Sequence, residues 1–255
     1  MSYSPDTVFI TGATGDFGHA FAQRFAKIGS KLILHGRSQA KLDALVSALP
    51  KGTNVTTLAI DLAMGADAIQ RAIQTIPDAF KDIDLLINNA GLALGASSAD
   101  QADLDDWLTM ININNAALVT VTHEVLKTMI NRGRGHIINL GSTAGSYPYP
   151  GGHVYCASKA FVKQFSLSLR ADLYSKNIRV TNIEPGMVET QFSLVRFKGD
   201  QEKADAVYKT TTPLTAADVA ESVFWAATLP EHCNINRIEL MPTRQAPGAL
   251  AVDRD

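Results

Sequence analysis

The sequence has few cysteines, little net charge and no long hydrophobic run. Its 255 residues include 2 cysteines, Cys156 and Cys233, too few for a disulfide framework or a four-thiolate zinc site. This scarcity favours a reducing compartment. The 23 basic and 25 acidic residues leave a net charge of −2, which gives no electrostatic footprint for nucleic acid or for an anionic membrane.

Neither a membrane span nor a signal peptide is evident. No apolar run approaches the roughly 18 residues that cross a bilayer, and the first residues, Met1–Asp6, contain no basic region. What is present is a hydrophobic fraction of 46% against 19% charged residues, enough to bury a large core. Because no linker, composition break or repeat divides the chain, we expect one soluble, cytoplasmic domain over residues 1–255.

Short β-rich runs alternate with longer helical patterns along the chain. The expected strands are Thr7–Thr11, Lys31–His35, Val55–Ile60, Asp84–Asn88, His136–Leu140, Arg179–Ile183 and Ile235–Leu240. The expected helices span residues 17–28, 39–48, 66–76, 103–131, 154–175 and 216–228. Most of the strands are continuously apolar, which is typical of parallel strands covered by helices on both faces. We therefore expect an α/β doubly wound sheet, with functional residues just after the carboxyl ends of its strands.

The first strand leads into a glycine-rich turn, Thr11-Gly12-Ala13-Thr14-Gly15-Asp16-Phe17-Gly18. Glycines at such a strand-to-helix turn let the backbone approach a pyrophosphate, and the helix N-terminus favours the anion. The spacing differs from GxGxxG, so a tight turn without a ligand explains this motif equally well when it is taken alone.

The end of the second strand favours NADP over NAD. An acidic residue there would bind the ribose 2′-hydroxyl of NAD, but the sequence has Arg37-Ser38 and no acid. A guanidinium suits a 2′-phosphate; the alternative is a solvated arginine. Asp61-Leu62 and Asn88-Asn89-Ala90-Gly91 follow the next two strands, where Asp61 would accept from the adenine amino group and the asparagines would tie loops together. Each of these alone is also a common turn or cap residue.

A second group of residues carries acid–base chemistry. Ser142 follows the fifth strand, and Tyr155 and Lys159 lie on one face of the next helix because they are spaced i,i+4. An ammonium near a phenol favours the phenolate, so we expect Lys159 to lower the pKa of Tyr155. Alone, this pair would be an ordinary surface pair. Six histidines include no HExxH pair, so no metal site is expected.

These motifs, with Asn114 in the central helix and Pro185-Gly186 after the sixth strand, resemble the short-chain dehydrogenase/reductase family over essentially the whole chain. The resemblance implies a Rossmann-like, seven-stranded parallel sheet of order 3-2-1-4-5-6-7, with a substrate lid near residues 187–212. It also implies that Tyr155 is the proton donor or acceptor and that Ser142 binds the substrate oxygen. Lys159 would hold the nicotinamide ribose and tune Tyr155, while Asn114 would support a water in the proton relay.

The cofactor that the resemblance implies is NADP(H). The residues expected against it are Gly12, Thr14, Gly15, Phe17, Gly18, Arg37, Ser38, Asp61, Leu62, Asn88, Asn89, Ala90, Gly91, Tyr155, Lys159, Pro185, Gly186, Val188 and Thr190. The turn departs from the family pattern Thr-Gly-x-x-x-Gly-x-Gly at Asp16. A carboxylate there either caps the helix, the use we favour, or faces the cofactor and repels its pyrophosphate.

Within the family, several stretches look like the NADP-dependent 3-hydroxy acid dehydrogenases, which interconvert a small 3-hydroxy acid and its aldehyde or keto form. The stretches are 89–95, 141–149, 159–167, 195–199 and 234–242. Arg196 lies in the expected lid and suits a carboxylate or a sulfonate; the alternative is a solvent-facing arginine. Tyr149 and His153 are expected in the same pocket, where His153 would either carry part of the anion's charge balance or simply cap the helix. The tail Gln245–Gly248 departs from this subgroup.

Other functions remain as alternatives. They are a sulfoacetaldehyde reductase, a general carbonyl or 3-oxoacyl reductase, and a non-enzymatic NADP-binding sensor, which would be expected to lose Tyr155 or Lys159. A serine hydrolase is disfavoured because Thr143, not serine, occupies the centre of Gly141–Gly145. The resemblance also implies a homotetramer or dimer packed through helices 103–131 and 154–175, which are apolar on more than one face.

Overall fold

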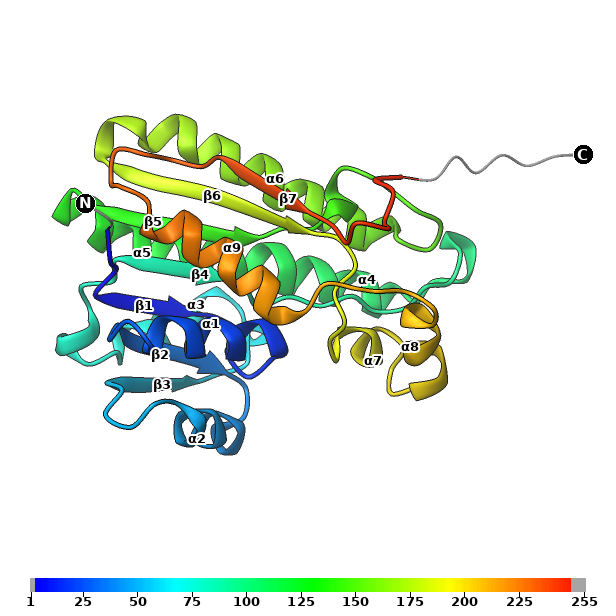
Figure 1. Ribbon diagram of the computed structural model, residues 1–255, viewed down its shortest axis with the longest axis horizontal. Coiled ribbons are helices and arrows are strands. Elements are labelled where there is room, and N and C mark those ends of the chain that lie inside the picture. The colour runs from blue at the N-terminus through cyan, green and yellow to red at the C-terminus, as the bar shows by residue number, and fades with distance from the viewer. Residues whose placement is uncertain (1–2, 249–255) are drawn as a thin grey trace, which may run out of the picture.

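The computed structural model describes residues 3–248, and its frame is one seven-stranded sheet in which all neighbours are parallel (Figure 1). The strand order is β3-β2-β1-β4-β5-β6-β7, as the family resemblance implies. The strands are β1 (Thr7–Ile10), β2 (Lys31–Gly36), β3 (Val55–Ala59), β4 (Leu85–Asn88), β5 (Gly135–Leu140), β6 (Ile178–Pro185) and β7 (Arg237–Leu240).

Helices cover both faces of this sheet. One face is packed by α1 (Asp16–Ala26), α2 (Gln39–Ala48) and α9 (Ala216–Thr228). The opposite face is packed by α3 (Ala66–Gln74), α5 (Leu118–Arg132) and α6 (His153–Leu173). The sheet is therefore doubly wound, and the crossovers place its strand-end loops together at the right of Figure 1.

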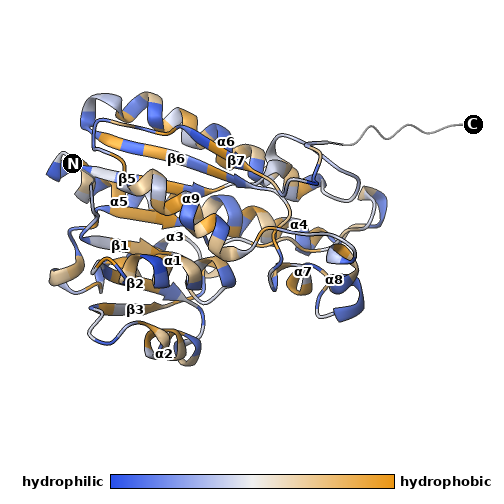
Figure 2. Ribbon diagram, viewed as in Figure 1, coloured by the Kyte–Doolittle hydropathy of each residue, from blue (hydrophilic) through white to orange (hydrophobic). Residues whose placement is uncertain are grey.

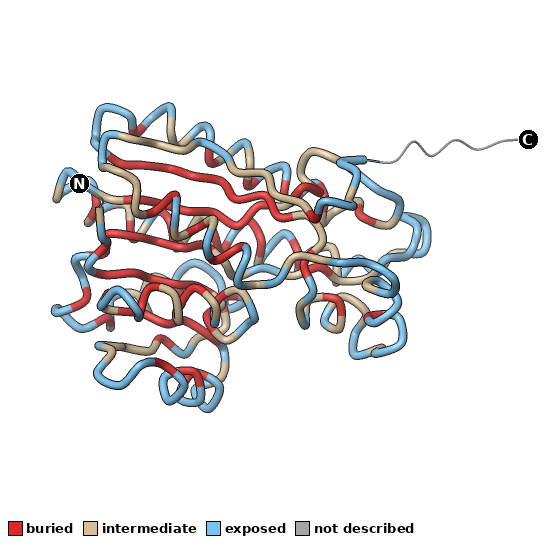
Figure 3. The backbone as a smooth tube through the Cα atoms, viewed as in Figure 1, coloured by how far each residue is buried: buried red, intermediate tan, exposed pale blue. Residues whose placement is uncertain are grey.

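The apolar strands form the middle of two cores. Val8 and Leu32 point to the α1 side, whereas their neighbours Phe9 and Ile33 point to the α3 side, and all four are at most 1% exposed. Each such side chain contributes about 1.5–3 kcal/mol by leaving water. Figures 2 and 3 show apolar colours and burial running along the central strands, with polar, exposed positions on the outer helix faces. This double burial explains why the strands read as continuous apolar runs.

The long helix expected over residues 103–131 is not a single regular helix. It consists of α4 (Leu104–Ile111), a π-helical segment (Asn112–Ala117) and α5. Within the segment, Asn114 bonds to Leu92 and Asn115 donates to the Ser158 carbonyl. Such bulges often lie at functional sites, because the extra residue re-aims a side chain.

Two short helices lie beyond the carboxyl ends of the strands, where the sequence predicted a lid but no elements. These are α7 (Phe192–Arg196) and α8 (Gln201–Tyr208), seen at the lower right of Figure 1. Backbone hydrogen bonds connect the chain before α7 with the chain after α8. The Glu189 amide donates to the Leu214 carbonyl at 2.9 Å, and the Leu214 amide donates to the Met187 carbonyl at 3.0 Å. No helix within residues 3–248 is long and apolar enough to cross a membrane.

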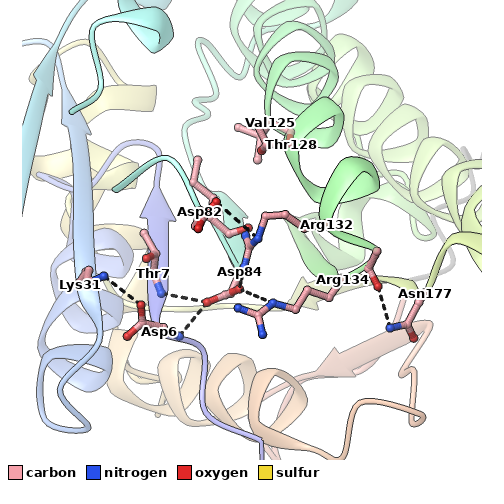
Figure 4. A network of polar contacts seen from close by, with 12 residues as sticks. Asp6, Thr7, Lys31, Asp82, Asp84, Val125, Thr128, Arg132, Arg134 and Asn177 are labelled. Atoms are coloured by element: carbon pink, nitrogen blue, oxygen red, sulfur yellow. Dashed lines mark hydrogen bonds and ion pairs between the residues drawn. The ribbon is translucent and has the colours of Figure 1, made fainter. Parts of the chain in front are cut away.

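The amino end of the sheet is closed by a polar network around Asp84 (Figure 4). Its carboxylate, 2% exposed, accepts from the amides of Asp6 and Thr7 at 3.0 and 3.3 Å. Arg132 and Arg134 supply the opposite charge from the end of α5 and the loop after it. Because a buried carboxylate needs such partners, the network fixes the entry of β1 beside β4, at the end of the sheet opposite the strand-end loops.

Candidate active site

The glycine-rich turn after β1 is held by the loop after β4. The Thr11 hydroxyl accepts from the amides of Asn89 and Ala90, both at 3.0 Å. In return, the Asn89 side-chain amide donates to the carbonyls of Thr11 and Gly12, each at 3.0 Å. The asparagine therefore ties the two loops together, as its position suggested.

Glycine is required at two positions of this turn. Gly12 has φ +63°, in the left-handed region that favours glycine. A Cβ on Gly18 would lie 2.4 Å from the Gly12 carbonyl oxygen and 2.5 Å from Ala13 Cα, so only glycine lets α1 begin against the turn. Gly15 is the N-cap of α1, while Thr14 packs its methyl group toward Gly36.

Asp16 does not cap α1, which corrects the use we favoured from the sequence. The N-cap is Gly15, and Asp16 is the first helical residue, where its charge still complements the helix dipole. Its carboxylate accepts a 2.7 Å hydrogen bond from the backbone amide of Gln191. Asp16 therefore joins the glycine-rich turn to the segment that contains α7 and α8.

The residues after β2 and β3 line the next part of the same edge. Arg37 is exposed at the end of β2, and Ser38 caps α2 by accepting from the Lys41 amide at 3.4 Å. Asp61 caps a short 3-10 turn, where it accepts from the Ala63 amide at 2.9 Å, and Leu62 beside it is buried. Phe17 packs against the core, its ring 6.2 Å from that of Phe21.

Asn88 is buried away from this edge and acts as a bridge between elements. Its side-chain amide donates to the Thr122 hydroxyl of α5 and to Asn139 Oδ1 of β5, each at 2.8 Å. Gly91, three residues later, lies over Asn114 and Lys159. A Cβ there would lie 3.2 Å from Asn114 Oδ1 and 3.5 Å from Lys159 Nζ.

Asn114 and Lys159 meet beneath Gly91, and both are buried. Asn114 Oδ1 accepts from the Leu92 amide at 2.9 Å, and its Nδ2 donates to the Leu92 carbonyl at 2.9 Å and to Ser158 Oγ at 3.1 Å. Lys159 Nζ donates to the Leu140 carbonyl at 2.8 Å and lies 5.8 Å from the centre of the Tyr155 ring. The structure thus brings Asn114, Lys159 and Tyr155 together from distant parts of the chain.

The pKa of Tyr155 moves in the opposite direction from the one we expected. Burial raises it above its ordinary value of 10.0, while a hydrogen bond with Ser142 and the charge of Arg196 act to lower it. Burial also lowers the pKa of Lys159 to about 8, because it disfavours the charged ammonium. Tyr155 is therefore protonated near neutral pH, the form that can donate a proton.

The segment before and within α7 covers Tyr155. The rings of Phe192 and Tyr155 lie 5.7 Å apart. Arg196, in the last turn of α7, donates from Nε to the Gly95 carbonyl at 3.1 Å and from one terminal nitrogen to the Tyr149 hydroxyl at 3.0 Å. Both acceptors are uncharged, and the guanidinium still acts on the pKa of Tyr155. Arg196 thus brings a positive charge close to Tyr155.

His153 contacts Ser97 and Trp107. Its Nε2 bonds to the Ser97 carbonyl at 3.2 Å, and its ring meets Trp107 edge-on at 4.9 Å. It does not cap α6, whose N-cap is Gly152.

The loop after β6 extends toward α7. The Gly186 amide donates to the Leu240 carbonyl at 2.8 Å, and the Thr190 hydroxyl accepts from the Phe192 amide at 3.3 Å. Pro185 ends β6, and Val188 bridges to Leu214. Between this loop, α8 and the glycine-rich turn lies an open cleft of about 260 Å³, lined by Asp16, Thr190, Gln191, Leu194 and Tyr208 among others.

Sequence reasoning missed three residues of this region. Phe192 and Gln245, which accepts from the Met187 amide at 2.7 Å, gave no recognisable signal. His35 is the next-to-last residue of β2, a position that could have marked it. Across residues 3–248, no group of three or more His, Cys, Asp or Glu side chains is placed to hold a metal ion.

Comparison with known proteins identifies the family of this chain. Residues 6–200 match the family model described as short chain dehydrogenase. Sulfoacetaldehyde reductase 2 of Chromohalobacter salexigens is 54% identical over 251 residues, 98% of this chain and 99% of that protein. The NADP-dependent 3-hydroxy acid dehydrogenase YdfG of Salmonella typhi is 52% identical over 248 residues, 97% of this chain and 99% of that one.

A solved structure is also similar over its full length. The closed form of serine dehydrogenase complexed with NADP+ superposes with a TM-score of 0.93 at 49% identity, covering 98% of this chain and 100% of that one. The fold of this chain therefore agrees with that of the solved structure. The chain belongs to the short-chain dehydrogenase/reductase family.

Proposed function

We propose that the protein is an NADP-dependent oxidoreductase that interconverts a small 3-hydroxy acid and its aldehyde or keto form. The observation that carries the substrate class is Arg196, whose guanidinium bonds to two uncharged oxygens near Tyr155. An arginine placed in this way can still bind a carboxylate through charge-assisted hydrogen bonds. The name of the 52% identical relative, an NADP-dependent 3-hydroxy acid dehydrogenase, supports the same class.

The turn after β1 fits the pyrophosphate of a dinucleotide. Its close approach to α1 depends on Gly12 and Gly18, where a side chain would block the backbone. Arg37, exposed at the end of β2, would pair with the 2′-phosphate, and Asp61 would lie by the adenine. We propose that the cofactor residues predicted from the sequence hold NADP(H) in this way, with Asn88 acting only through the loop that it supports.

When bound, the cofactor supplies or accepts the hydride. In reduction, Tyr155 donates its proton to the substrate oxygen, and in oxidation its phenolate takes that proton back. Ser142, whose hydroxyl interacts with Tyr155, holds the same oxygen. Lys159 and Asn114 lie behind Tyr155 and would return the proton through water. Burial raises the pKa of Tyr155, which favours the proton-donating form used in reduction.

We also propose that residues 187–212 act as a substrate lid of a single domain. Three contacts support this function: Gln191 to Asp16, Arg196 to Gly95, and Lys198 to Asp106 at 2.9 Å. They join the segment to the glycine-rich turn, to the loop after β4 and to α4. Closing the lid would bring Arg196 to the acid group and exclude water from the reacting carbon.

A sulfonate is the second candidate for the substrate anion. The guanidinium of Arg196 matches the oxygens of a sulfonate as well as those of a carboxylate. The 54% identical relative is named a sulfoacetaldehyde reductase. A general carbonyl reductase would not need this cation, so neutral substrates separate that alternative from both acids.

Exposed apolar residues on α4 and α6 favour association of several copies of this chain. Leu104, Leu108 and Ile111 form an exposed stripe on α4, 44–62% exposed, and Phe161 on α6 is 43% exposed. Faces of this kind support a homotetramer or dimer packed through these helices. A reducing, cytoplasmic location fits the two free thiols, Cys156 and Cys233.

Oxidation of matched alcohols tests the proposed function. We expect NADP+-dependent turnover of 3-hydroxypropionate, 3-hydroxyisobutyrate, serine or allo-threonine, and little of methyl 3-hydroxypropionate, which has the same reacting carbon without the charge. The formation of NADPH gives the rate. Equal kcat/KM for 3-hydroxypropionate and its methyl ester would contradict recognition of the anion.

A further inference from the structure

His35 holds the glycine-rich turn from the neighbouring strand. It is the fifth residue of β2 and is 3% exposed. Its Nδ1 accepts from the Gly12 amide at 3.1 Å, and its backbone carbonyl accepts from the Ala13 amide at 2.7 Å. Two consecutive amides of the turn are thus fixed by one residue, and one of these bonds depends on the imidazole.

The other ring nitrogen reaches the third strand. Nε2 lies 3.1 Å from the carbonyl oxygen of Ile60, the residue before Asp61. The ring therefore connects the Gly12 turn, the Gly36–Arg37 strand end and the Ile60–Asp61 strand end. These are the three segments that the proposed function places against the adenosine and pyrophosphate of the cofactor.

The two bonds determine the state of the ring. A backbone amide can only donate, so Nδ1 must be unprotonated, and a carbonyl can only accept, so the proton must be on Nε2. Protonation of Nδ1 would set an N–H against the N–H of Gly12. The observed turn is therefore compatible only with neutral His35.

We propose that His35 is a positioning residue for the cofactor: its neutral ring holds Gly12 in the conformation that receives the pyrophosphate. This inference rests on the proposed function, because it concerns affinity for NADP(H). His35 does not touch the reacting atoms. Its loss should weaken cofactor binding much more than it slows turnover at cofactor saturation.

The surroundings of His35 favour the neutral ring. Burial lowers its pKa below the ordinary value of 6.5, while the Ile60 carbonyl and the charge of Asp61 act in the opposite direction. Asp61, on the loop after β3, is the titratable side chain whose charge reaches the ring; no charged side chain of the turn after β1 acts on it. Cofactor affinity should therefore hold at neutral pH and fall in acid as His35 takes a proton.

Calorimetric titration of the intact protein with NADPH provides the test. His35→Leu removes both ring bonds at similar volume, and we expect it to weaken NADPH binding by about tenfold or more, because the Gly12 amide loses its acceptor. His35→Asn keeps an acceptor near the position of Nδ1 and should recover part of the affinity. The KM for NADPH should rise in both variants by more than kcat falls.

His136→Asn is the matched control. His136, the second residue of β5, is another buried histidine, 1% exposed, and its ring bonds to Thr181 of β6, far from the turn. The substitution His136→Asn should lower thermal stability while leaving the NADPH dissociation constant within about twofold of the wild-type value. If His35→Leu and His136→Asn bind NADPH equally well, His35 is only a core residue and the proposal is wrong.

The pH dependence distinguishes a positioning role even if His35→Leu does not fold. As the pH is lowered below about 6.5, the wild-type affinity for NADPH should fall more steeply than that of His35→Asn, which has no ring to protonate. The 2′-phosphate titrates equally in both proteins, so the difference belongs to His35. Identical slopes would overturn the proposal. A wild type that binds no NADPH would instead contradict the proposed function.

Discussion

Replacement of Arg196 by glutamine should separate substrates by their charge. In the structure, the guanidinium is held by Gly95 and Tyr149, both of which are uncharged, so its charge is available for a ligand. Hydrogen bonds to a charged group contribute about 1.5–3 kcal/mol. Loss of that interaction corresponds to a fall of about 10- to 150-fold in kcat/KM for an anionic aldehyde.

The same substitution also loosens the lid, and a neutral substrate measures that part. Arg196→Gln loses the 3.1 Å bond to the Gly95 carbonyl and the 3.0 Å bond to the Tyr149 hydroxyl. These losses affect an anionic and a neutral aldehyde of similar size alike. The ratio of the two kcat/KM values therefore reports the charge alone, and it should fall by about tenfold or more.

Two further variants act as controls. Tyr149→Phe removes the hydroxyl that accepts from Arg196 but leaves the charge, so it should change the ratio much less. Arg196→Lys keeps a charge without the planar fork and should fall between the wild type and Arg196→Gln. The assay is the initial rate of NADPH consumption. If Arg196→Gln lowers both kcat/KM values by the same factor, Arg196 holds the lid and does not bind the anion.

Four other predictions follow from the site and the core. Tyr155→Phe should lower kcat by at least about 100-fold with little change in NADPH affinity, and substantial turnover by the variant would exclude Tyr155 as the acid. The wild-type oxidation rate should rise with pH, because oxidation needs the phenolate and burial raises the pKa of Tyr155. Arg37→Ala should weaken NADPH binding by about tenfold or more and NADH binding little, whereas equal losses in titrations would contradict its pairing with the 2′-phosphate. Asp16→Ala should tighten NADPH binding, because it removes a carboxylate near the pyrophosphate. It should also raise the KM for the aldehyde, because the Gln191 amide loses its acceptor, and an unchanged KM would show that the Asp16–Gln191 bond does not hold the lid. Burial holds the pKa of His136 well below 6.5, so the protein loses stability as the pH falls below about 6.5. In chemical denaturation, the free energy of unfolding should fall less with acid in His136→Asn than in the wild type. An equal fall in both proteins would refute this contribution of His136.

The strands and the strand-end motifs could be predicted from the sequence because they depend on local patterns. Buried parallel strands leave continuous apolar runs, and the turns that follow them carry Gly12, Ser142 and Asp61 at fixed places. The π-helical segment around Asn114 could not be predicted, because it depends on bonds to Leu92 and to Ser158, distant in sequence.

Side-chain partners set by tertiary contacts were the hardest to foresee. Asp16 looked like a cap, yet its partner is the amide of Gln191, 175 residues away. The direction of the Tyr155 pKa was also wrong, because i,i+4 spacing gives proximity to Lys159 but not the burial of both groups. His153 shares the first turn of α6 with Tyr155, but the packing of Trp107 determines where its ring lies.

The most direct test of the central claim is a comparison of initial reduction rates. NADPH and NADH would each be paired with malonic semialdehyde, sulfoacetaldehyde and a neutral aldehyde of similar size. The account predicts fast reduction of an anionic aldehyde with a clear preference for NADPH, and the better anion would choose between a carboxylate and a sulfonate. A higher kcat/KM for the neutral aldehyde, or equal rates with NADH, would contradict the functions given to Arg196 and Arg37.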